Sequence, residues 1–551
     1  MSINRGALKS MKKLPSLPDI PEQDQTPVVK ALLGLTVQLI ERVQQRDEEI
    51  ALLKDEINIL KGEKKRPVFK GSKLDKNTEP DTDESSGLVS KKRPGSCKKS
   101  KTKKLMIHED KVIKPDAPVP RGSRFKGYRN FVVQDLKIES HNIRYRLEHW
   151  VTPQQESITG QLPPDLNNQH FGPHLISYIL YQYHHCQITQ PLLLEQLREW
   201  GIDISSGQIN QILLHEKATF HCEKDQLLQA GLTASSFITV DDSGARHQGK
   251  NGFVTQIGNE LFGWFQSTGS KSRINFLELL RSGKTDYVLS EAALDYMKKQ
   301  TLPAQPLKQL NSLKGRSFAD KEAWLQLLGN LAITNQRHQR FATEGALLGS
   351  VLRHGLCDDL TIVSDDAGQF NILLHALCWV HTERLIHKML PLNETHRQEI
   401  KVIRSQVWDF YAELKRYKRK PDRTHIKRLR HRFDEIFTQK TSYATLNQTL
   451  RRIHNNKAEL LVVLDRPEIP LHTNGSETDI RDYVKKRKVS GGTRSDEGRR
   501  CRDTFASLKK TCRKLDISFW HYLTDRLGVG KKTIAPLPEI IYKRAAIATD
   551  Y

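Results

Sequence analysis

Cysteine is scarce in this sequence and is never spaced for cross-linking. The 551 residues contain seven cysteines, scattered along the chain, and no two of them form a Cys-x-x-Cys pair. A disulfide framework and a zinc ribbon both depend on paired cysteines, so neither is indicated. We therefore expect reduced thiols.

Long hydrophobic stretches are also missing. No apolar run approaches the roughly 18 residues of a membrane span. The first residues, MSINRGALKSMKKLPSLP, lack the apolar stretch of a secretory signal. These absences predict a cytoplasmic protein with no membrane partner.

Acidic residues are fewer than basic ones. Lys and Arg total 88 against 64 Asp and Glu, which gives a net charge of +24. An excess of this size favours a polyanionic partner such as nucleic acid, because each phosphate that is neutralised releases a counterion. A basic surface that only keeps the protein soluble is the alternative. The length of the chain predicts two or three folded regions joined by linkers.

A heptad pattern runs through residues 29–61. Leucine stands at the d positions and mostly β-branched residues stand at the a positions, with Arg46 as the one interruption. This pattern favours a parallel two-stranded coiled coil, and hence a homodimer or higher oligomer. An amphipathic helix lying on the globular body would give a similar pattern.

Residues 62–122 are rich in Lys, Ser, Asp and Pro and have few apolar residues, so we expect a disordered basic linker. Its lysines and arginines between residues 91 and 104 could contact phosphates or could simply be solvated. Residues 123–165 alternate in NFVVQDLKIE and NIRYRLEHWV, which predicts a small antiparallel β region with a turn around Ser140 to Asn142.

Helical periodicity dominates residues 171–232. Ser205 is placed to cap the third of the helices expected there. Short helices of this kind are typical both of a helix-turn-helix DNA-binding region and of a plain helical core.

Two apolar segments that end in pairs of acids follow. SFITV, FVTQIG and LFGWFQST predict three strands, the first ending at Asp241 and Asp242. LTIVS predicts another strand, ending at Asp365 and Asp366. Carboxylates brought together at one sheet edge repel each other unless a cation neutralises them, and hard oxygen ligands select Mg²⁺ or Mn²⁺.

A third acid comes from HTNGSETDIRDYVKKRK, where Glu477 lies just inside a helix opened by Asn474 or Ser476 and shares a face with Arg481. Three acids could hold two metal ions, which would activate water or a 3′-hydroxyl for in-line displacement at phosphorus. Taken singly, each acid is more typical of a strand-end turn or of a helix N-terminus than of a metal ligand.

The residues after Glu477 are dense in cations, which could contact DNA phosphates or form a solvated helix face. The candidates for DNA contact are Arg481, Lys485, Lys486, Arg487, Lys488, Arg499 and Arg500.

Four segments resemble one family, the insertion sequence 66 family of DDE transposases. Val240 to Ser243 stand where that family has Val-Asp-Glu-Thr, SDDAGQF contains the second aspartate, and CWVHTER is similar to the family's Cys-Trp-Ala-His-x-Arg-Arg. Asn474, Glu477 and Arg481 fit Asn-x-x-Glu-x-x-x-Arg, and SLKKTCRKLDISFWHYL resembles the closing helix. The likeness covers about residues 171–525.

The resemblance implies an α/β fold, an RNase H-like mixed-sheet DDE catalytic domain at 235–525 with a helical insertion at about 390–465, followed by a C-terminal tail at 526–551. It implies that Asp241, Asp365 and Glu477 are the catalytic and metal-binding residues, with two Mg²⁺ or Mn²⁺ ions. It further implies cleavage and strand transfer on double-stranded DNA at transposon ends and target, companion proteins, and a bacterial protein that is nucleoid-associated when bound to DNA.

The sequence departs from the family's pattern in three places. Residues 124–165 contain no cysteine where the family has a zinc-binding module, 124 residues separate Asp241 from Asp365, and Thr478 replaces the arginine of the usual Glu-Arg pair. A Cys-x-x-His pair, Cys378 and His381, could bind zinc, but no second pair accompanies it, so we expect a structural role.

Two other functions fit the same residues. One is a catalytically silent DNA-binding or regulatory protein of the same fold. The other is a metal-dependent nuclease that hydrolyses DNA without joining it.

Overall fold

The computed structural model describes residues 106–163, 170–356 and 359–549, together with residues 26 and 29. The coiled coil expected at 29–61 and most of the linker expected at 62–122 lie outside the described residues. The chain divides into two units at residue 106, and every contact below belongs to the second. Within the described residues, no helix is long and apolar enough to cross a membrane.

The small β region differs from its prediction. Residues 106–148 form neither helix nor strand, and the only strands between residues 106 and 163 are β1 (His149–Val151) and β2 (Ser157–Thr159). They pair antiparallel, so the turn falls after Val151 rather than around Ser140 to Asn142. Thr152 closes this turn, donating from its N–H to the Glu156 carbonyl at 2.8 Å. The polar run TPQQE therefore sets the hairpin, because it contains proline and no residue that needs burial.

After the hairpin, helices begin at residue 173, as the periodicity predicted. They are α4 (Pro173–Leu180), the π-helix η5 (Tyr181–His185), α5 (Gln190–Glu199), α6 (Ser206–Leu214) and α7 (Ala218–Thr233). Ser205 caps α6 as predicted, with a capping box that it shares with Gln208.

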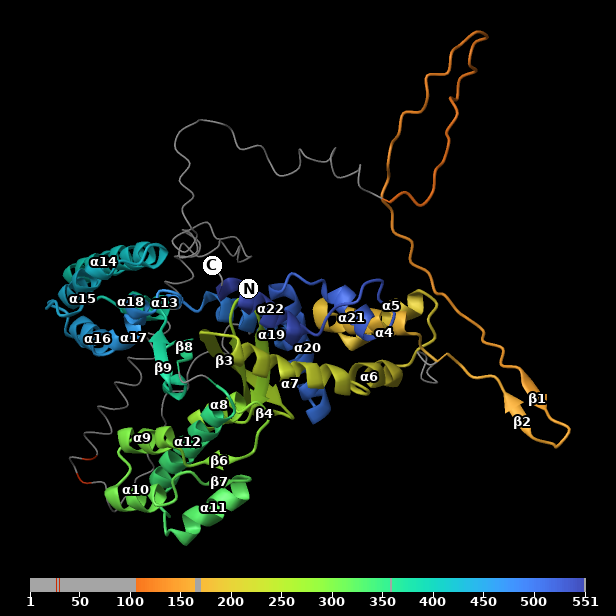
Figure 1. Cartoon of the computed structure of the whole chain (residues 1–551). Coiled ribbons are helices and arrows are strands. Elements are labelled where there is room, and N and C mark those ends of the chain that lie inside the picture. The colour runs from red at the N-terminus through yellow and green to blue at the C-terminus, as the bar shows by residue number, and fades with distance from the viewer. Residues whose placement is uncertain (1–25, 27–28, 30–105, 164–169, 357–358, 550–551) are drawn as a thin grey trace. The chain divides into compact units, whose positions relative to one another are not determined.

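A five-stranded mixed sheet lies at the centre of the unit (Figure 1). Its strands are β3 (Phe237–His247), β4 (Lys250–Gly258), β5 (Gly263–Thr268), β8 (Thr361–Ser364) and β9 (Leu374–Leu377), in the order β5-β4-β3-β8-β9. The pairs among β3, β4 and β5 are antiparallel, and β8 and β9 add in parallel.

β3 does not end at Asp241 and Asp242, as the sequence had predicted. It continues to His247, because β4 pairs with it from Thr239, opposite Gly258, to His247, opposite Lys250. Asp241 therefore lies inside a strand rather than at its end.

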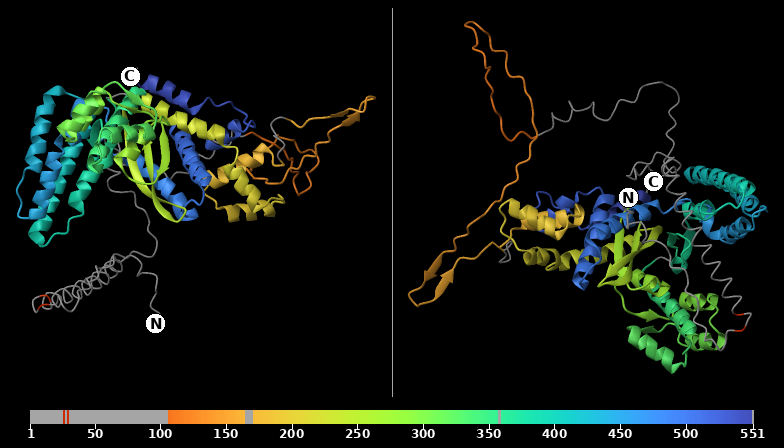
Figure 2. Two further views of the ribbon diagram at one scale, coloured as in Figure 1. Left: turned by 90° about the horizontal axis from the view of Figure 1, so that it is seen from below. Right: turned by 180° about the vertical axis from the view of Figure 1, so that it is seen from behind.

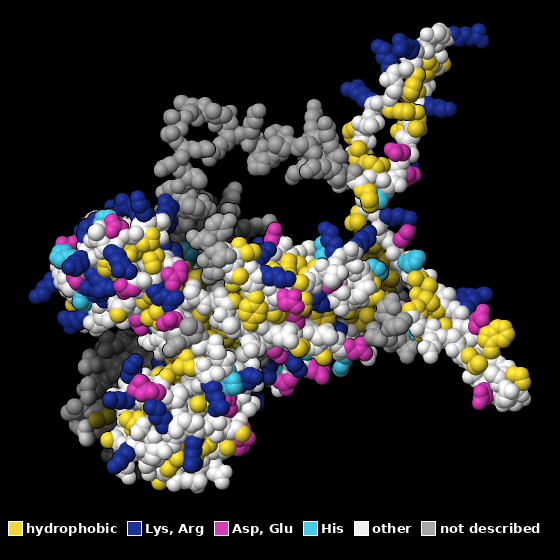
Figure 3. Space-filling view, viewed as in Figure 1, with side chains coloured by type: hydrophobic (Ala, Val, Ile, Leu, Met, Phe, Trp, Pro, Cys, Tyr) yellow, Lys and Arg dark blue, Asp and Glu magenta, His cyan; other side chains and the backbone are white. Residues whose placement is uncertain are grey.

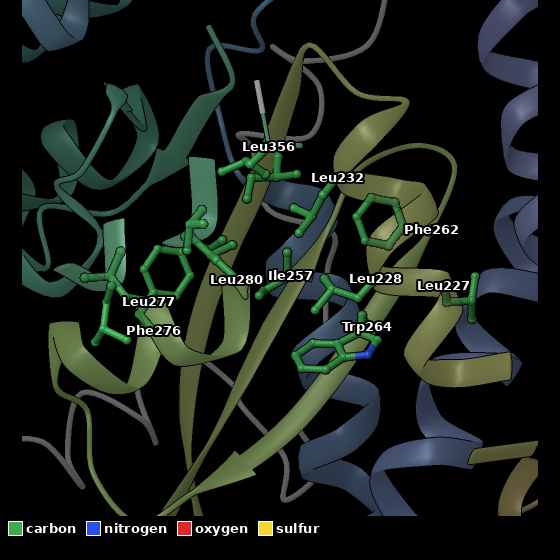
Figure 4. Close-up of a cluster of buried hydrophobic side chains, with 14 of the residues drawn as sticks. Leu227, Leu228, Leu232, Ile257, Phe262, Trp264, Phe276, Leu277, Leu280 and Leu356 are labelled. Carbon is green, nitrogen blue, oxygen red and sulfur yellow. The ribbon is translucent and has the colours of Figure 1, made fainter. Parts of the chain in front are cut away.

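The two faces of the sheet are covered by different helices. Side chains of Ile238, Val240, Ile257 and Trp264 pack in the main hydrophobic core with α7 and with α8 (Arg273–Leu280), and Figure 4 shows leucines of both helices beside Ile257 and Trp264. The opposite face carries Val254 and Phe265, which pack on Tyr483 of α19 (Asn474–Ser490).

Between β5 and β8 lie the extra helices that the sequence had suggested. The elements after α8 are β6 (Tyr287–Val288), α9 (Glu291–Lys299), α10 (Ala304–Asn311), β7 (Ser317–Phe318), α11 (Lys321–Asn330) and α12 (Gln336–Arg353). Gly345 and Gly349 let α12 approach α9 and β6, since a Cβ on Gly349 would lie 2.2 Å from the Val288 carbonyl oxygen.

A helical insertion with its own hydrophobic core follows β9. It contains α13 (Trp379–His387), α14 (Glu394–Arg419), α15 (Arg423–Phe437), α16 (Ala444–Asn455), α17 (Lys457–Leu460) and α18 (Val462–Asp465). Trp379 is fully buried in this core among Phe410, Phe433 and Phe437. The long helices α14 and α15 run side by side (Figure 2), and Lys and Arg side chains are numerous on their outer surface (Figure 3).

The chain closes with α19, α20 (Asp496–Lys514), α21 (Phe519–Arg526) and α22 (Leu537–Thr549). The expected tail at 526–551 thus contains a helix, α22, which packs on α7 and buries Leu537 and Ile541.

Helix α20 covers the β5 edge of the sheet with side chains spaced four residues apart. The N–H groups of Gly263, Phe265 and Ser267 donate to Thr511 Oγ1 at 3.2 Å, Ser507 Oγ at 2.9 Å and Asp503 Oδ2 at 2.8 Å. Two residues along a strand advance about 6.7 Å, and four residues along a helix advance about 6 Å. The spacing of the N–H donors on β5 therefore matches the spacing of the acceptors on α20. The outer edge is therefore satisfied without another strand.

Candidate active site

Strand register places Asp241 beside Asp365. In the parallel pair, Phe237, Ile238 and Thr239 lie opposite Thr361, Ile362 and Val363. Two further residues along each chain reach Asp241 and Asp365, so the two acids are neighbours at the point where β8 ends. They share a sheet face with Thr239 and Val363, because side chains alternate along a strand.

Strand alternation also separates Asp241 from Asp242. Asp242 points to the opposite face, where its carboxylate accepts hydrogen bonds from Thr255 Oγ1 at 2.5 Å and Gln369 Nε2 at 3.0 Å. Asp241 accepts only from the backbone N–H of Asp242, at 2.8 Å, among the hydrogen bonds of the described residues. Asp241 is thus the carboxylate left available on the α19 side.

A similar distinction holds for the second pair of acids. Asp366 is bound by the guanidinium of Arg452 from α16. Asp365 instead accepts the N–H of Ala367 at 3.2 Å, which orders the turn after β8. Asp365 keeps the second carboxylate oxygen for another ligand.

Glu477 is brought to the same face by the first turn of α19. Ser476 donates its hydroxyl to Thr239 Oγ1 at 2.6 Å, which fixes the start of the helix to the strand two residues before Asp241. The helix begins at Asn474, but its N-cap is Thr473 rather than Asn474 or Ser476, and no side chain caps it. Glu477 and Arg481 share a helix face, as predicted, with Arg481 Nη2 at 3.0 Å from Glu477 Oε2.

The electrostatics of Asp241 reflect this convergence. The pKa of Asp241 is raised to about 6, chiefly by burial and also by the negative charges of Asp365 and Glu477, against the opposing effects of the Asp242 N–H and His381. A carboxyl group is hard to ionise where it is both desolvated and surrounded by like charge. A cation placed among the three acids would relieve that cost.

The Cys-x-x-His pair joins the insertion to this face. Cys378 is the buried N-cap residue of α13, and its sulfur accepts the N–H of Thr473 at 3.4 Å. The hydrogen bond to Cys378 is the main cause that raises the pKa of His381. His381 Nε2 lies 3.5 Å from Glu477 Oε1. Nothing in the sequence analysis predicted that His381 and Arg384 would contact the third acid. Both residues belong to the CWVHTER segment, which is similar to the family's Cys-Trp-Ala-His-x-Arg-Arg.

The cations proposed for DNA contact are not equivalent. Arg481, Lys485, Lys488 and Arg500 are exposed, and Arg487 and Arg499 are partly exposed. Lys486 is buried, with its ammonium 3.5 Å from the Tyr183 ring centroid and 2.8 Å from the Tyr183 carbonyl. Lys486 therefore joins α19 to η5 and does not face a solvent-side ligand.

The donor chemistry suits a hard divalent cation, since all three acids supply oxygen. In the described residues, however, no three His, Cys, Asp or Glu side chains are gathered closely enough to hold a metal ion. Asp241 and Asp365 are adjacent by register, whereas Glu477 is engaged by cationic side chains, with Arg384 Nη1 at 3.1 Å.

Comparison with known proteins gives a family match and a relative. Residues 344–500, which contain Asp365 and Glu477, match the model of the Transposase IS66 family. An uncharacterized protein of Sinorhizobium fredii (strain NBRC 101917 / NGR234), y4jO, is 46% identical over 321 residues, which is 58% of this chain and all of that protein. The chain therefore belongs to the IS66 family of transposases.

Proposed function

We propose that this protein is a DNA transposase that binds the ends of its element, cleaves them and joins them to target DNA, with Asp241, Asp365 and Glu477 as its catalytic acids. The observation that carries the proposal is the placement of these acids. Two lie side by side by strand register, and the helix that bears the third is fixed to the same face by the Ser476–Thr239 hydrogen bond.

The sheet order supports an RNase H-like core. The proposed fold requires three antiparallel strands followed by two parallel ones, with the first acid on the central strand. The sheet has this arrangement. In this interpretation, residues 390–465 are the helical insertion between the second acid and the third.

The proposed chemistry needs two divalent ions, Mg²⁺ or Mn²⁺, which would activate the attacking oxygen and stabilise the leaving one. Asp241 and Asp365 supply oxygens from one sheet edge, and Glu477 supplies them from α19. The hydrogen bonds at Ser476 and Ala367 keep the supporting backbone in place, so that the acids keep their spacing.

DNA would lie along α19 and the start of α20. The exposed or partly exposed cations there would contact phosphates without reading sequence; they are Arg481, Lys485, Arg487, Lys488, Arg499 and Arg500. We leave Lys486 out of this set because of its burial. Pairing of two protein copies through a coiled coil at 29–61 would hold two element ends together, with companion proteins as further partners and the nucleoid as the place of action.

The test is magnesium-dependent cleavage and joining of labelled DNA that carries the element's own ends. Asp241→Asn, Asp365→Asn and Glu477→Gln should each abolish both activities while DNA binding remains. Asp242→Asn and Asp366→Asn are the matched controls, since each removes one neighbouring carboxylate that is engaged elsewhere, and they should retain activity.

Three results would redirect the proposal. DNA binding without cleavage, in Mg²⁺ and in Mn²⁺, would favour the silent DNA-binding protein. Cleavage without joining would favour a nuclease. Loss of activity in the controls but not in the three named variants would show that Asp242 and Asp366 are the catalytic acids instead.

A further inference from the structure

Glu477 is surrounded by cationic side chains from two helices. Its Oε1 lies 3.1 Å from Arg384 Nη1 and 3.5 Å from His381 Nε2, both on α13. Its Oε2 lies 3.0 Å from Arg481 Nη2, one turn further along α19. The Glu477 side chain is only 14% exposed, so these contacts occupy both of its oxygens in a largely desolvated setting.

The two arginines have no other carboxylate partner among the contacts of the described residues. Arg384 otherwise approaches only His381 Nε2, at 3.2 Å, and Arg481 bonds Glu477 alone. If Glu477 turned its oxygens to a metal ion, both guanidinium groups would need another anion. Their side chains are 33% and 66% exposed, so both can reach a ligand arriving from solvent.

The backbone beneath Arg384 is held independently of Glu477. The neighbouring Glu383 is buried and is bound by Arg404 of α14. The start of α13 is tied to Thr473 through Cys378. Only the end of the Arg384 side chain therefore has to move for its partner to change.

We infer that Arg384 and Arg481 exchange partners: they bind Glu477 in the protein free of metal and DNA, and bind a DNA backbone phosphate once a divalent cation takes the Glu477 carboxylate. This inference rests on the proposed function, because it needs Glu477 as a metal ligand. It makes Arg384 a residue that binds the substrate phosphate and positions the third acid.

The exchange links two binding events. Metal binding frees the two arginines for phosphate, and phosphate binding frees Glu477 for metal, so each ligand must strengthen the other by the same factor. Without DNA the arginines compete with the metal for Glu477. Removing one of them should therefore tighten metal binding, which is the opposite of what loss of a supporting residue would do.

The experiment is calorimetric titration of the full-length, DNA-free protein with Mn²⁺. Arg384→Gln and Arg481→Gln should each bind Mn²⁺ about twofold to fivefold more tightly than the unchanged protein, the upper part of the range expected for losing one partly exposed ion pair at the site. Arg384→Lys keeps the charge but loses the planar guanidinium, and should show a smaller gain. Lys271→Gln removes an exposed cation whose charge acts on Asp242, and should change the affinity less than twofold.

Two further measurements complete the test. In a Glu477→Gln background, Arg384→Gln should leave Mn²⁺ affinity unchanged, because the competition is gone. Addition of element-end DNA should tighten Mn²⁺ binding to the unchanged protein more than to Arg384→Gln.

The outcomes distinguish the inference from the proposed function. If Asp241→Asn and Glu477→Gln do not weaken Mn²⁺ binding, the proposed metal site itself fails. If they do weaken it while Arg384→Gln and Arg481→Gln are neutral or weakening, the exchange is refuted and the metal site stands. A thermal unfolding curve for each variant shows whether its fold is retained.

Discussion

At the scale of single residues, Asp241 carries an energetic cost in the protein without metal. Its pKa is raised to about 6, first by burial and then by Asp365 and Glu477. An Asp whose folded pKa exceeds its unfolded value loses stability as pH rises from the unfolded pKa to the folded one, because the unfolded state releases its proton first. The cost is absent below about pH 4 and complete above about pH 6.

Asp241→Asn should therefore stabilise the protein in the presence of a chelator at pH 8, by about 2 to 3 kcal/mol, the equivalent of a shift of about two pKa units. At pH 3.5 the variant and the unchanged protein should be equally stable. Thermal or urea unfolding at the two pH values measures this. Equal stability at both, or destabilisation at pH 8, would contradict the assigned environment of Asp241.

Added Mg²⁺ should reverse that order at pH 8. The unchanged protein should gain stability with metal concentration, as any ligand specific to the folded state requires, and Asp241→Asn should gain little. The unfolding midpoint at several Mg²⁺ concentrations measures both, with Asp242→Asn as the control expected to respond like the unchanged protein.

At the scale of elements, close backbone contacts and edge contacts hold the sheet and its helices together. Gly349 is the tightest point of the contact between α12 and β6, where the obstacle to a Cβ is the backbone oxygen of Val288. Backbone atoms cannot move aside as a flexible side chain can, so a methyl group there displaces the helix.

Gly349→Ala should destabilise the protein by about 1 to 3 kcal/mol or more. Gly329→Ala in α11 is the matched control, since no atom lies within 4 Å of its added Cβ. It should be neutral or stabilising by up to about 1 kcal/mol, because alanine favours helix. Chemical denaturation of both variants compares them, and equal effects would contradict the packing described for α12.

The α20 contacts to the β5 edge give a second prediction at this scale. Ser507→Ala leaves the buried N–H of Phe265 without its acceptor, which should cost about 1 to 3 kcal/mol. Ser490→Ala in α19 removes a buried hydroxyl that has no hydrogen-bond partner in the described structure, and should cost nothing. Similar losses of stability in both variants would show that the Ser507 contact contributes little.

The sequence was informative about elements wherever local signals agreed with the fold. The cap at Ser205, the strands β3, β4, β5 and β8 and the presence of a helix at Glu477 followed from capping residues, alternation and periodicity. The extension of β3 past Asp242 did not, because it depends on pairing with β4 rather than on apolar residues in DSGARH. The hairpin at 149–159 was misplaced for a related reason, since alternating residues in 130–148 form no strand.

The same limit applied to the candidate site. Motif resemblance could select three acids, but their preference over Asp242 and Asp366 comes from long-range partners, Gln369 and Arg452, that no local pattern reveals. Likewise the burial of Lys486 depends on Tyr183, some 300 residues earlier in the chain. The positions of Lys and Arg along the sequence do not show which of these side chains face solvent.

At the scale of the whole molecule, the net charge of +24 should appear as salt-dependent DNA binding. Replacing Lys485, Arg487, Lys488 and Arg500 with alanine should reduce the slope of log affinity against log salt concentration by up to about 3 to 4, since each phosphate contact contributes about 0.9. Four exposed lysines of α9 to α11, Lys298, Lys299, Lys308 and Lys321, give a variant of equal charge that should keep the slope. Fluorescence anisotropy at several salt concentrations measures it, and equal slopes for the two variants would place the DNA elsewhere.

The covering of β5 by α20 has a consequence for the order in which a newly made chain acquires its properties. The acceptors for the N–H groups of β5 follow them in the chain by 236 to 248 residues. The ribosome needs about 12 to 50 seconds to synthesise that length at 5 to 20 residues per second. During that time the sheet has an open edge. The same closing pair of helices, α19 and α20, also brings Glu477, the proposed third acid. A chain released before α19 would thus lack both the protection of its sheet and the complete set of proposed acids, and the edge acceptors of α20 follow Glu477 in the chain.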